Sequence, residues 1–314
     1  MAAGLVDMLR WIPAYAQMEK ENAQLRLRVA ELERKEAEWA RFVPPGHFYS
    51  PLPSNEEIAR AFARGGFGPP FSAVDLNEAG QFARIERFAG YHADQPFPEE
   101  PVPGRRFHLG NNSYGHYDAI MLYAMLREAQ PRRVIEVGSG FSSAAMLDVS
   151  EHVLARPIEF TFIDPDMIRL RPLLRADDLT RCTLIERCVQ DVPLETFAAL
   201  EANDVLFIDS SHVSKIGSDV NRIFFDILPV LAPGVLIHIH DVTGNLEPPR
   251  GWLEEGRAWN EQYVLRAFLM YNPAYRIELF TSWLLNMRHA WFIEHMPLCA
   301  RGGGGQLWLR KLAK

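Results

Sequence analysis

This 314-residue sequence has no long apolar run, no excess of basic residues and no closely spaced cysteines. Because no stretch of about 18 apolar residues occurs, no helix is expected to span a membrane. The formal net charge of −7 argues against binding to nucleic acid or to acidic membranes. The three cysteines, Cys182, Cys188 and Cys299, lack the spacing of zinc ligands and are expected to be reduced thiols. These absences favour a globular, cytoplasmic protein.

The N-terminal residues do not resemble a secretory signal peptide. Asp7, Arg10 and Pro13 interrupt the apolar stretch that such a peptide needs, and no basic start precedes it. We therefore expect a soluble, intracellular protein.

Residues 14–41 contain no Gly or Pro and are rich in Ala, Glu, Leu and Arg, which predicts a long helix. Apolar residues recur in it at alternating spacings of four and three, with one Asn where a buried polar side chain often fixes the register. This heptad series consists of Met18, Asn22, Leu25, Val29, Leu32 and Trp39. We interpret residues 1–43 as a coiled-coil extension that makes a homo-oligomer. The alternative is an amphipathic helix packed on its own domain.

The next segment, residues 44–110, mixes short helical patterns with prolines and glycines. Helices are expected at 55–64 and 76–88, with irregular connections between them. The stretch 47–49, His-Phe-Tyr, would suit a lid over a ligand. The alternative is a loop that packs on the core.

From residue 111 to 314 short apolar strands alternate with helical stretches. The expected strands are 133–137, 159–163, 183–187, 204–208, 234–239, 275–280 and 306–311. The expected helices are 117–128, 141–153, 166–176, 194–202, 215–231 and 260–271. This alternation predicts an α/β fold with a doubly wound, mostly parallel, Rossmann-like sheet of seven strands.

The stretch Arg133–Leu147 combines a strand, a glycine turn at Gly138-Ser139-Gly140 and the start of a helix. Glycines allow a tight turn and close approach of a ligand, and a helix N-terminus offers free N–H groups. In such sheets the ligand lies beyond the carboxyl ends of the strands. Polar residues stand at or just after those ends, namely Glu136, Asp164, Gln190, Asp191, Asp209, His212, His238, His240 and Asp241.

Four motifs carry a resemblance to a known family: EVGSG at 136–140, FIDPD at 162–166, FIDSSHV at 207–213 and the His-Asp pair at 240–241. Together they resemble the class I S-adenosylmethionine-dependent methyltransferases over residues 111–312. Within this family the chain is similar to the bacterial small-molecule and sugar O-methyltransferase branch with FIDxSH and HD motifs.

The resemblance implies S-adenosylmethionine as cofactor and methylation of a hydroxyl on a small-molecule or sugar-type acceptor. It implies these cofactor-binding residues: Glu136 for the methionine amino group, Gly138, Ser139 and Gly140 around the methionine and ribose, Asp164 for the ribose hydroxyls, Gln190 and Asp191 for the adenine, and Asp209 beside the sulfonium. Ser143 replaces the third glycine of a dinucleotide fingerprint, which disfavours an NAD-linked oxidoreductase. An N-methyltransferase acting on a small molecule or peptide and a non-catalytic cofactor-binding scaffold remain as alternatives.

Histidines are the candidate bases for removing a proton from the acceptor, because their pKa lies near neutrality. We expect His212 or His240 in this role, with His238 as a weaker candidate and Asp209 or Asp241 orienting the ring. All three histidines follow or end predicted strands.

A divalent metal is the other way to activate a hydroxyl. The resemblance implies that Asp209 and Asp241 take the positions of metal ligands, with His240 or Asn245 nearby. Magnesium prefers oxygen ligands, and a histidine would shift the preference towards manganese, iron or zinc.

The segment 245–263 is a long connection rich in aromatic and charged residues, and connections of this length are usually functional. We expect it to form a wall of the acceptor pocket. The alternative is that Trp259 and Tyr263 only anchor the following helix. The residues expected to contact the acceptor are Tyr114, Arg250, Trp252 and Trp259.

Overall fold

The computed structural model describes residues 13–40, 42–63 and 73–313 of the chain. The chain forms two compact units, Met1–Ala63 and Arg64–Lys314. The division falls inside the segment 44–110 that was expected as one helical and loop region. Val74 and the residues after it already contribute to the core of the second unit.

Within its described residues, the first unit contains the helices α2 (Pro13–Ala40) and α3 (Asn55–Ala63). The single 28-residue helix α2 matches the helix that the composition predicts, and Pro44 follows shortly after its end. A capping box starts α3, because Ser54 Oγ accepts from the Glu57 N–H at 3.2 Å and the Glu57 carboxylate accepts from the Ser54 N–H at 2.8 Å.

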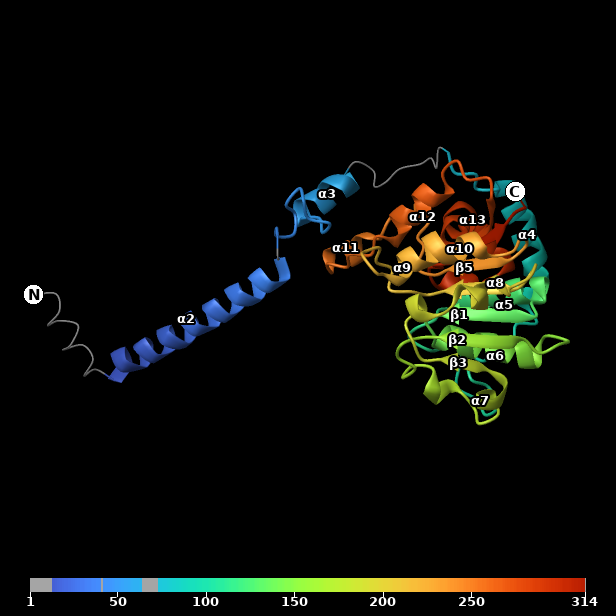
Figure 1. Cartoon of the computed structure of the whole chain (residues 1–314), viewed down its shortest axis with the longest axis horizontal. Coiled ribbons are helices and arrows are strands. Elements are labelled where there is room, and N and C mark those ends of the chain that lie inside the picture. The colour runs from blue at the N-terminus through green and yellow to red at the C-terminus, as the bar shows by residue number, and fades with distance from the viewer. Residues whose placement is uncertain (1–12, 41, 64–72, 314) are drawn as a thin grey trace, which may run out of the picture. The chain divides into compact units, whose positions relative to one another are not determined.

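The second unit is built on a seven-stranded sheet, which confirms the predicted Rossmann-like architecture. Its strands are β1 (Arg133–Val137), β2 (Glu159–Ile163), β3 (Thr183–Ile185), β4 (Val205–Ile208), β5 (Leu236–Ile239), β6 (Tyr275–Phe280) and β7 (Leu307–Lys311). Their order across the sheet is β3-β2-β1-β4-β5-β7-β6, and β7 runs antiparallel to both of its neighbours. Figure 1 shows β3, β2 and β1 side by side. The strand order reverses between β1 and β4, the type of position where such sheets bind ligands.

Helices and single turns connect these strands. The helices are α4 (Glu78–His92), α5 (His116–Ala129), α6 (Phe141–His152), α7 (Asp178–Arg181), α8 (Leu194–Ala198), α9 (Asp219–Arg222), α10 (Leu228–Val230), α11 (Arg250–Glu254), α12 (Glu261–Leu269) and α13 (Thr281–His295). The short turns are η1 (Arg171–Leu173), η2 (Val189–Asp191), the π-turn η3 (Ile223–Ile227) and η4 (Cys299–Arg301). Among the described helices, none has the length and apolar character to cross a membrane.

The helix expected at 166–176 does not form. Asp164 accepts from the Asp166 N–H at 2.8 Å, and Asp166 accepts from the Ile168 N–H at 3.0 Å. Aspartate side chains that bind nearby backbone in this way compete with helix formation. The segment therefore runs as turns as far as η1.

Helix α13 is present although the sequence analysis did not predict it. It follows β6 directly, and its backbone leaves helical geometry at Arg288, with φ −131° and ψ 29°. This kink interrupts the periodic pattern from which a continuous helix is predicted.

The core of the second unit lies around α5 and the central strands. Every residue of α5 from Tyr117 to Leu126 is buried, and α5 packs against α4 and α6. All four residues of β4 and all four of β5 are buried as well. A helix and strands buried on all sides hold the carboxyl edge of the sheet in a fixed position.

The strand register brings the expected site residues to one edge. Val137 of β1 pairs with Ile163 of β2 and with Ile208 of β4, and Ile208 pairs with Ile239 of β5. The residues that follow these four are Gly138, Asp164, Asp209 and His240. They therefore emerge side by side where the sheet ends.

Candidate functional site

The glycine turn after β1 needs a residue without a side chain at its first position. Gly138 has φ +83°, and a Cβ there would lie 1.8 Å from the carbonyl oxygen of Asp209. The turn is held by the Gly138 N–H on the Ile163 carbonyl at 2.9 Å and by the Asp209 N–H on the Val137 carbonyl at 2.8 Å. The strand ends of β1 and β4 can approach this closely only with glycine at position 138.

Asp164 at the end of β2 is tied to the same turn. Its carboxylate accepts from the Ser139 N–H at 2.9 Å and from the Asp166 N–H at 2.8 Å. A carboxylate has about four acceptor sites, so Asp164 retains capacity for a ligand that donates two hydrogen bonds.

Glu136 lies beneath the turn and is fully buried. Its carboxylate accepts from Ser142 Oγ at 2.5 Å and from Ser143 Oγ, and Ser143 Oγ accepts from the Gly140 N–H at 2.9 Å. Burial raises the pKa of Glu136 to about 8, against the lowering effect of the two serine hydroxyls. Glu136 therefore acts on the turn through Ser142 and Ser143, and its position behind them was not foreseen.

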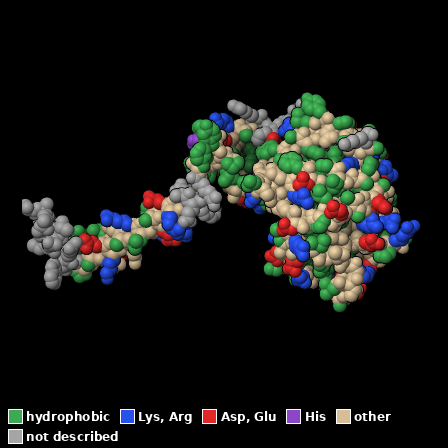
Figure 2. All heavy atoms as spheres, viewed as in Figure 1, with side chains coloured by type: hydrophobic (Ala, Val, Ile, Leu, Met, Phe, Trp, Pro, Cys, Tyr) green, Lys and Arg blue, Asp and Glu red, His purple; other side chains and the backbone are tan. Residues whose placement is uncertain are grey.

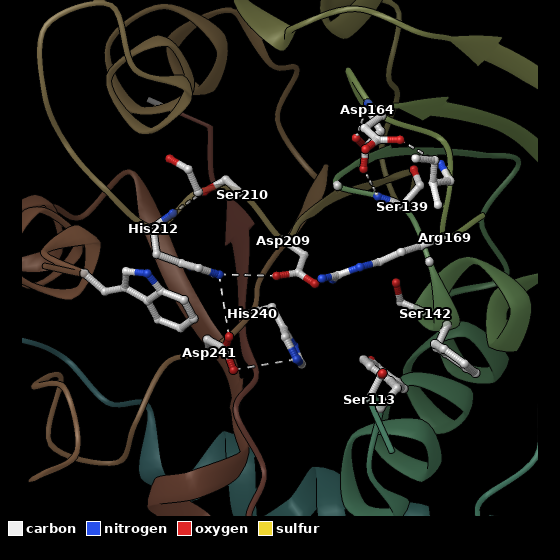
Figure 3. A pocket seen from close by; sticks show the side chains of 18 of the residues that line it. Ser113, Ser139, Ser142, Asp164, Arg169, Asp209, Ser210, His212, His240 and Asp241 are labelled. Carbon is white, nitrogen blue, oxygen red and sulfur yellow. Dashed lines mark hydrogen bonds and ion pairs between the residues drawn. The ribbon is translucent and has the colours of Figure 1, made fainter. Parts of the chain in front are cut away.

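A cavity of about 730 Å³ opens beside this edge of the sheet. Its lining includes these residues expected from the sequence: Tyr114, Gly138, Ser139, Gly140, Asp164, Asp209, His212, His240, Asp241 and Trp259. An adjoining cavity of about 280 Å³ is lined in part by Gly138, Asp164, Pro165 and Gln190. Most of the expected site residues thus converge on one continuous region (Figure 3).

Several expected residues do not line either cavity. Asp191 is exposed in η2, whereas its neighbour Gln190 lines the smaller cavity and donates to the Gly217 carbonyl at 2.9 Å. Arg250 pairs with Glu254 at 2.7 Å on the exposed side of α11. Glu136 and Trp252 stand behind lining residues and do not line the cavities themselves.

His212 lies at the centre of a cluster of carboxylates in the larger cavity. Its Nδ1 is 2.8 Å from Glu261 Oε2, and its Nε2 is 3.4 Å from Asp209 Oδ1 and 3.5 Å from Asp241 Oδ2 (Figure 3). The ring also packs on Trp259, with centroids 4.5 Å apart. Both ring nitrogens therefore face carboxylate oxygens.

These contacts change the ionisation of His212. Burial alone would lower its pKa, but the hydrogen bonds to Asp209 and Glu261 outweigh burial and raise the pKa to about 10. Without a metal ion, His212 is therefore protonated near neutral pH and does not act as a base, and a cation at its Nε2 would have to displace that proton. Burial would raise the pKa of Asp209, but the hydrogen bond with His212 outweighs this effect and holds the pKa of Asp209 below its ordinary value.

His240 borders the same cavity from the end of β5. Its ring stacks on Tyr114 at 5.3 Å between centroids, its Nε2 is 3.9 Å from Asp241 Oδ1, and its buried Nδ1 has no hydrogen-bond partner among the described residues. Burial lowers and the charges of Asp209, Asp118 and Asp241 raise the pKa of His240, with a net increase.

His238 is fully buried beneath His240 and stacks on Phe207 with centroids 3.7 Å apart. Burial, with the neighbouring His240, lowers the pKa of His238 well below its ordinary value. His238 is therefore a neutral core residue that does not line the cavity.

Asp209, His212 and Asp241 form the group of potential metal ligands within the described chain. One ligand atom from each lies within 4.8 Å of the others. His240 was expected as the histidine of this group, but His212 takes that place because its left-handed backbone, with φ +59°, turns the ring back towards β4 and β5. Asn245 instead accepts from Thr243 Oγ1 at 3.2 Å.

The connection after β5 supplies an aromatic wall. Trp259 lines the larger cavity, and the guanidinium of Arg257 stacks over it at 4.7 Å from the ring centroid. Trp252 packs edge-on against Trp259, with centroids 4.8 Å apart, and so supports the wall from behind. Stacked aromatic and guanidinium groups suit a flat or ring-shaped ligand.

The lining or supporting residues that the sequence did not predict include Arg169, Arg257 and Glu261. Arg169 was assigned to a helix, but from its turn it extends towards Asp209 (Figure 3). Glu261 is the second residue after Trp259, and only its contact with His212, 49 residues away in the chain, reveals its role. Two residues so far apart in the chain form no local sequence pattern from which their contact could be predicted.

Two comparisons with known sequences match parts of this chain. Residues 135–242 match the family model described as "Methyltransferase domain". A protein of Archaeoglobus fulgidus described as uncharacterised is 31% identical over 179 residues, which cover 54% of this chain and 79% of that protein.

Solved structures with a similar arrangement include two methyltransferases. One is the SAH-bound methyltransferase PaMTH1 of Podospora anserina, with 18% identity, coverage of 83% of this chain and 98% of that chain, and a TM-score of 0.41. The other is the O-methyltransferase TomG of Streptomyces achromogenes in complex with SAM, with 15% identity, coverage of 73% and 90%, and a TM-score of 0.40.

The seven-stranded sheet with its antiparallel β7, the glycine turn and the matched family model together define the class. The chain therefore contains a methyltransferase domain, which the family model matches over residues 135–242.

Proposed function

We propose that this methyltransferase transfers the methyl group of S-adenosylmethionine to a hydroxyl oxygen of a small-molecule or sugar-type acceptor, beside a divalent cation held by Asp209, His212 and Asp241. S-adenosylhomocysteine is the leaving group, and the hydroxyl proton passes to His240, which lines the cavity. The observation that carries the proposal is the convergence of two carboxylates and one imidazole within 4.8 Å at the ends of β4 and β5. A hydroxyl needs activation before it attacks a methyl group, whereas an amine needs less.

The proposed cofactor region runs along the ends of β1 and β2. Ser139, Gly140 and the start of α6 offer N–H groups to the methionine part, and Asp164 accepts from the ribose hydroxyls. The adenine enters the smaller cavity beside Pro165 and Gln190. In this arrangement Glu136 positions the turn through Ser142 and Ser143, whose hydroxyls it accepts.

The donor set fits a transition-metal cation. Ligands of one ion at about 2.1 Å lie roughly 3–4 Å apart, close to the 3.4 and 3.5 Å that separate His212 Nε2 from the carboxylates of Asp209 and Asp241. Glu261 accepts at His212 Nδ1 at 2.8 Å, which is the partner that a metal-binding histidine commonly has. One nitrogen among oxygen donors favours manganese, iron or zinc over magnesium.

When bound, the cation would lower the pKa of an acceptor hydroxyl and hold its oxygen in place. The chain's own residues do the rest. Trp259 and Tyr114 offer ring faces to the acceptor, and Arg257 extends the wall at Trp259. Asp241 and Asp209 accept hydrogen bonds that orient the hydroxyl, and the packed walls exclude water from the reacting atoms.

Ser143 also supports a methyltransferase over a dinucleotide enzyme. Its hydroxyl donates to Glu136 and accepts from the Gly140 N–H. A dinucleotide fingerprint has a third glycine at this position, whereas here a serine side chain stabilises the turn.

Calorimetric titration of the whole chain tests the proposal. S-adenosylhomocysteine is titrated with and without EDTA, and Mn²⁺ and Zn²⁺ are titrated separately. We expect micromolar binding of the nucleoside and one bound cation per chain. Glu261→Gln should weaken cation binding by about 10- to 100-fold and change nucleoside binding by less than about threefold.

The matched control is Glu254→Gln, because Glu254 is an exposed acid of the same connection that pairs with Arg250. It should change neither affinity. Equal loss of cation binding in both variants, or no bound cation in the unmodified chain, would overturn the metal site. Absence of nucleoside binding under every condition would overturn the assignment of the cofactor region.

A further inference from the structure

Helix α2 carries an apolar stripe that no other described residue of its own unit covers. Met18, Leu25, Val29 and Leu32 are 50–62% exposed, and none of the side chains described in α2 is buried. Figure 2 shows apolar side chains along this helix between groups of charged ones. A helix in water gains most of its stability by packing an apolar face, so the stripe calls for a partner.

The stripe has the spacing of a two-stranded coiled coil. In heptad positions, Tyr15, Asn22 and Val29 are the a residues and Met18, Leu25 and Leu32 are the d residues. The helix spans 28 residues, which is four heptads. A β-branched residue at a with leucine at d favours two strands. Trp39 continues the d series, but its side chain lies outside the described residues.

We propose that α2 pairs with α2 of a second copy of this chain as a parallel, in-register coiled coil. The charged residues beside the stripe are the reason for choosing a second copy of α2 as the partner. In this arrangement a g residue faces the e residue of the next heptad on the other chain. Glu21 then faces Arg26 of the partner subunit, and Arg28 faces Glu33 of the partner subunit. Symmetry repeats both pairs, so all four contacts join opposite charges.

Contacts within a single α2 do not prevent this pairing. Arg28 pairs with Glu31 at 2.9 Å, and both side chains are 42–60% exposed. Gln17 donates to Glu21 at 2.9 Å, also in an exposed position. Exposed contacts of this kind contribute little and can be exchanged for contacts across the interface.

Asn22 favours the same register. In the parallel arrangement it faces Asn22 of the partner subunit, and two amides can hydrogen-bond to each other. An antiparallel pair that sets Leu25 against Val29 brings Arg26 against its own copy and Arg28 against its own copy. An antiparallel pair that sets Asn22 against Leu25 matches the charges but leaves the buried amide without a partner.

Parallel pairing has a structural consequence for the enzyme. Both chains leave the coiled coil at the same end, after Ala40, so two methyltransferase units follow from that end. The inference does not depend on the acceptor or on the metal.

Sedimentation equilibrium of the full chain, with charge exchange at three positions, tests the inference. The unmodified chain should have twice its mass of 35.8 kDa. Glu21→Lys should raise the dimer dissociation constant by about tenfold, because it creates two repulsive contacts. Adding Arg26→Glu to Glu21→Lys should restore the original constant, whereas adding Arg28→Glu should raise the constant further.

The matched control is Lys20→Glu, which changes a charge at an outward-facing f position and should leave the dissociation constant unchanged. Rescue by Arg28→Glu in place of Arg26→Glu would overturn the parallel orientation in favour of an antiparallel pair. A monomeric chain at micromolar concentration, or an equal effect of Lys20→Glu and Glu21→Lys, would overturn the coiled coil. Thermal unfolding of each variant verifies that the methyltransferase unit stays folded.

Discussion

The two ends of the large cavity are built in different ways. At the proposed cofactor end, backbone hydrogen bonds to neighbouring strand ends fix Gly138 and Asp164, and the Asp164 carboxylate and the Ser143 hydroxyl accept from the N–H groups of Ser139 and Gly140. At the acceptor end, side chains from distant parts of the chain meet, and Glu261 on α12 contacts His212, which follows β4. The geometry of the first end follows from the pairing of the strands. The geometry of the second end depends on side-chain contacts between segments that are far apart in the chain.

The difference indicates how such an enzyme can keep one cofactor and accept different acceptors. Strand register determines the cofactor end, so changes there disturb the fold. The connection 245–263 and the start of α12 determine much of the acceptor end, and connections tolerate substitution better than strand ends do. The substitutions below separate these two kinds of construction.

The largest effect is expected for Gly138→Ala, because this substitution should disturb both ends of the cavity at once. A Cβ at this position would overlap the Asp209 carbonyl oxygen at 1.8 Å, and φ is +83°. Because Asp209 belongs to the acceptor end, both ends should be displaced. We expect loss of nucleoside binding by at least about 100-fold and a decrease in the free energy of unfolding of about 2–4 kcal/mol. Calorimetry and denaturant titration measure these changes.

Gly251→Ala is the control for this substitution. No atom lies within 4 Å of the position a Cβ would take at Gly251, which is part of α11. Its stability should remain the same or rise by up to about 1 kcal/mol, since alanine favours helix. Similar losses in both variants would show that the close approach at Gly138 is not what the fold requires.

A smaller effect is expected for Asp164→Ala, which addresses the cofactor end alone. The variant loses the carboxylate that accepts from Ser139 and would accept from the ribose, so nucleoside affinity should fall by about 10- to 100-fold. Asp191→Ala should change the affinity by less than about threefold, because Asp191 is exposed and lines neither cavity. The reverse order of effects in calorimetric titrations would move the cofactor towards η2.

The smallest effect is expected for Glu136→Gln and depends on pH. Burial, with the charges of Asp209 and Asp164, raises the pKa of Glu136 to about 8 in the folded chain, from 4.5 when unfolded. Between these values the folded state retains a proton that the unfolded state releases, so this group's contribution to stability is lost as pH rises. The melting temperature of the glutamine variant should therefore rise relative to that of the unmodified chain as the pH increases from 5 to 9.

Differential scanning calorimetry across this pH range measures the change, with Glu195→Gln as control on the exposed surface of α8. A difference between Glu136→Gln and the unmodified chain that stays constant with pH would contradict a protonated Glu136 beneath the glycine turn.

The sequence predicted the sheet well, and it placed Gly138 and Asp164 at the ends of neighbouring strands, because both follow from local patterns. Apolar runs of four to six residues mark buried strands, and Gly138 and Asp164 stand directly after two of them. Local competition was harder to predict. Asp164 and Asp166 bind their own backbone and prevent a helix at 166–176, although the residues that follow have helical propensity.

The acceptor end shows what a sequence pattern leaves open. His240 was expected among the metal ligands and His212 as a base, but His212 is the one that lies between Asp209 and Asp241. Its left-handed backbone conformation and its contact with Glu261 decide this placement, and neither is visible as a spacing of residue types.

By itself, the sequence determined where the strands lie along the chain, the glycine turn and the heptad stripe of α2. Each of these depends on residues that are close together in the chain. Only the tertiary structure decided which histidine meets the two carboxylates, which tryptophan lines the cavity and where Glu136 is buried. Those positions depend on contacts between segments tens to more than a hundred residues apart, and packing of the whole core fixes them.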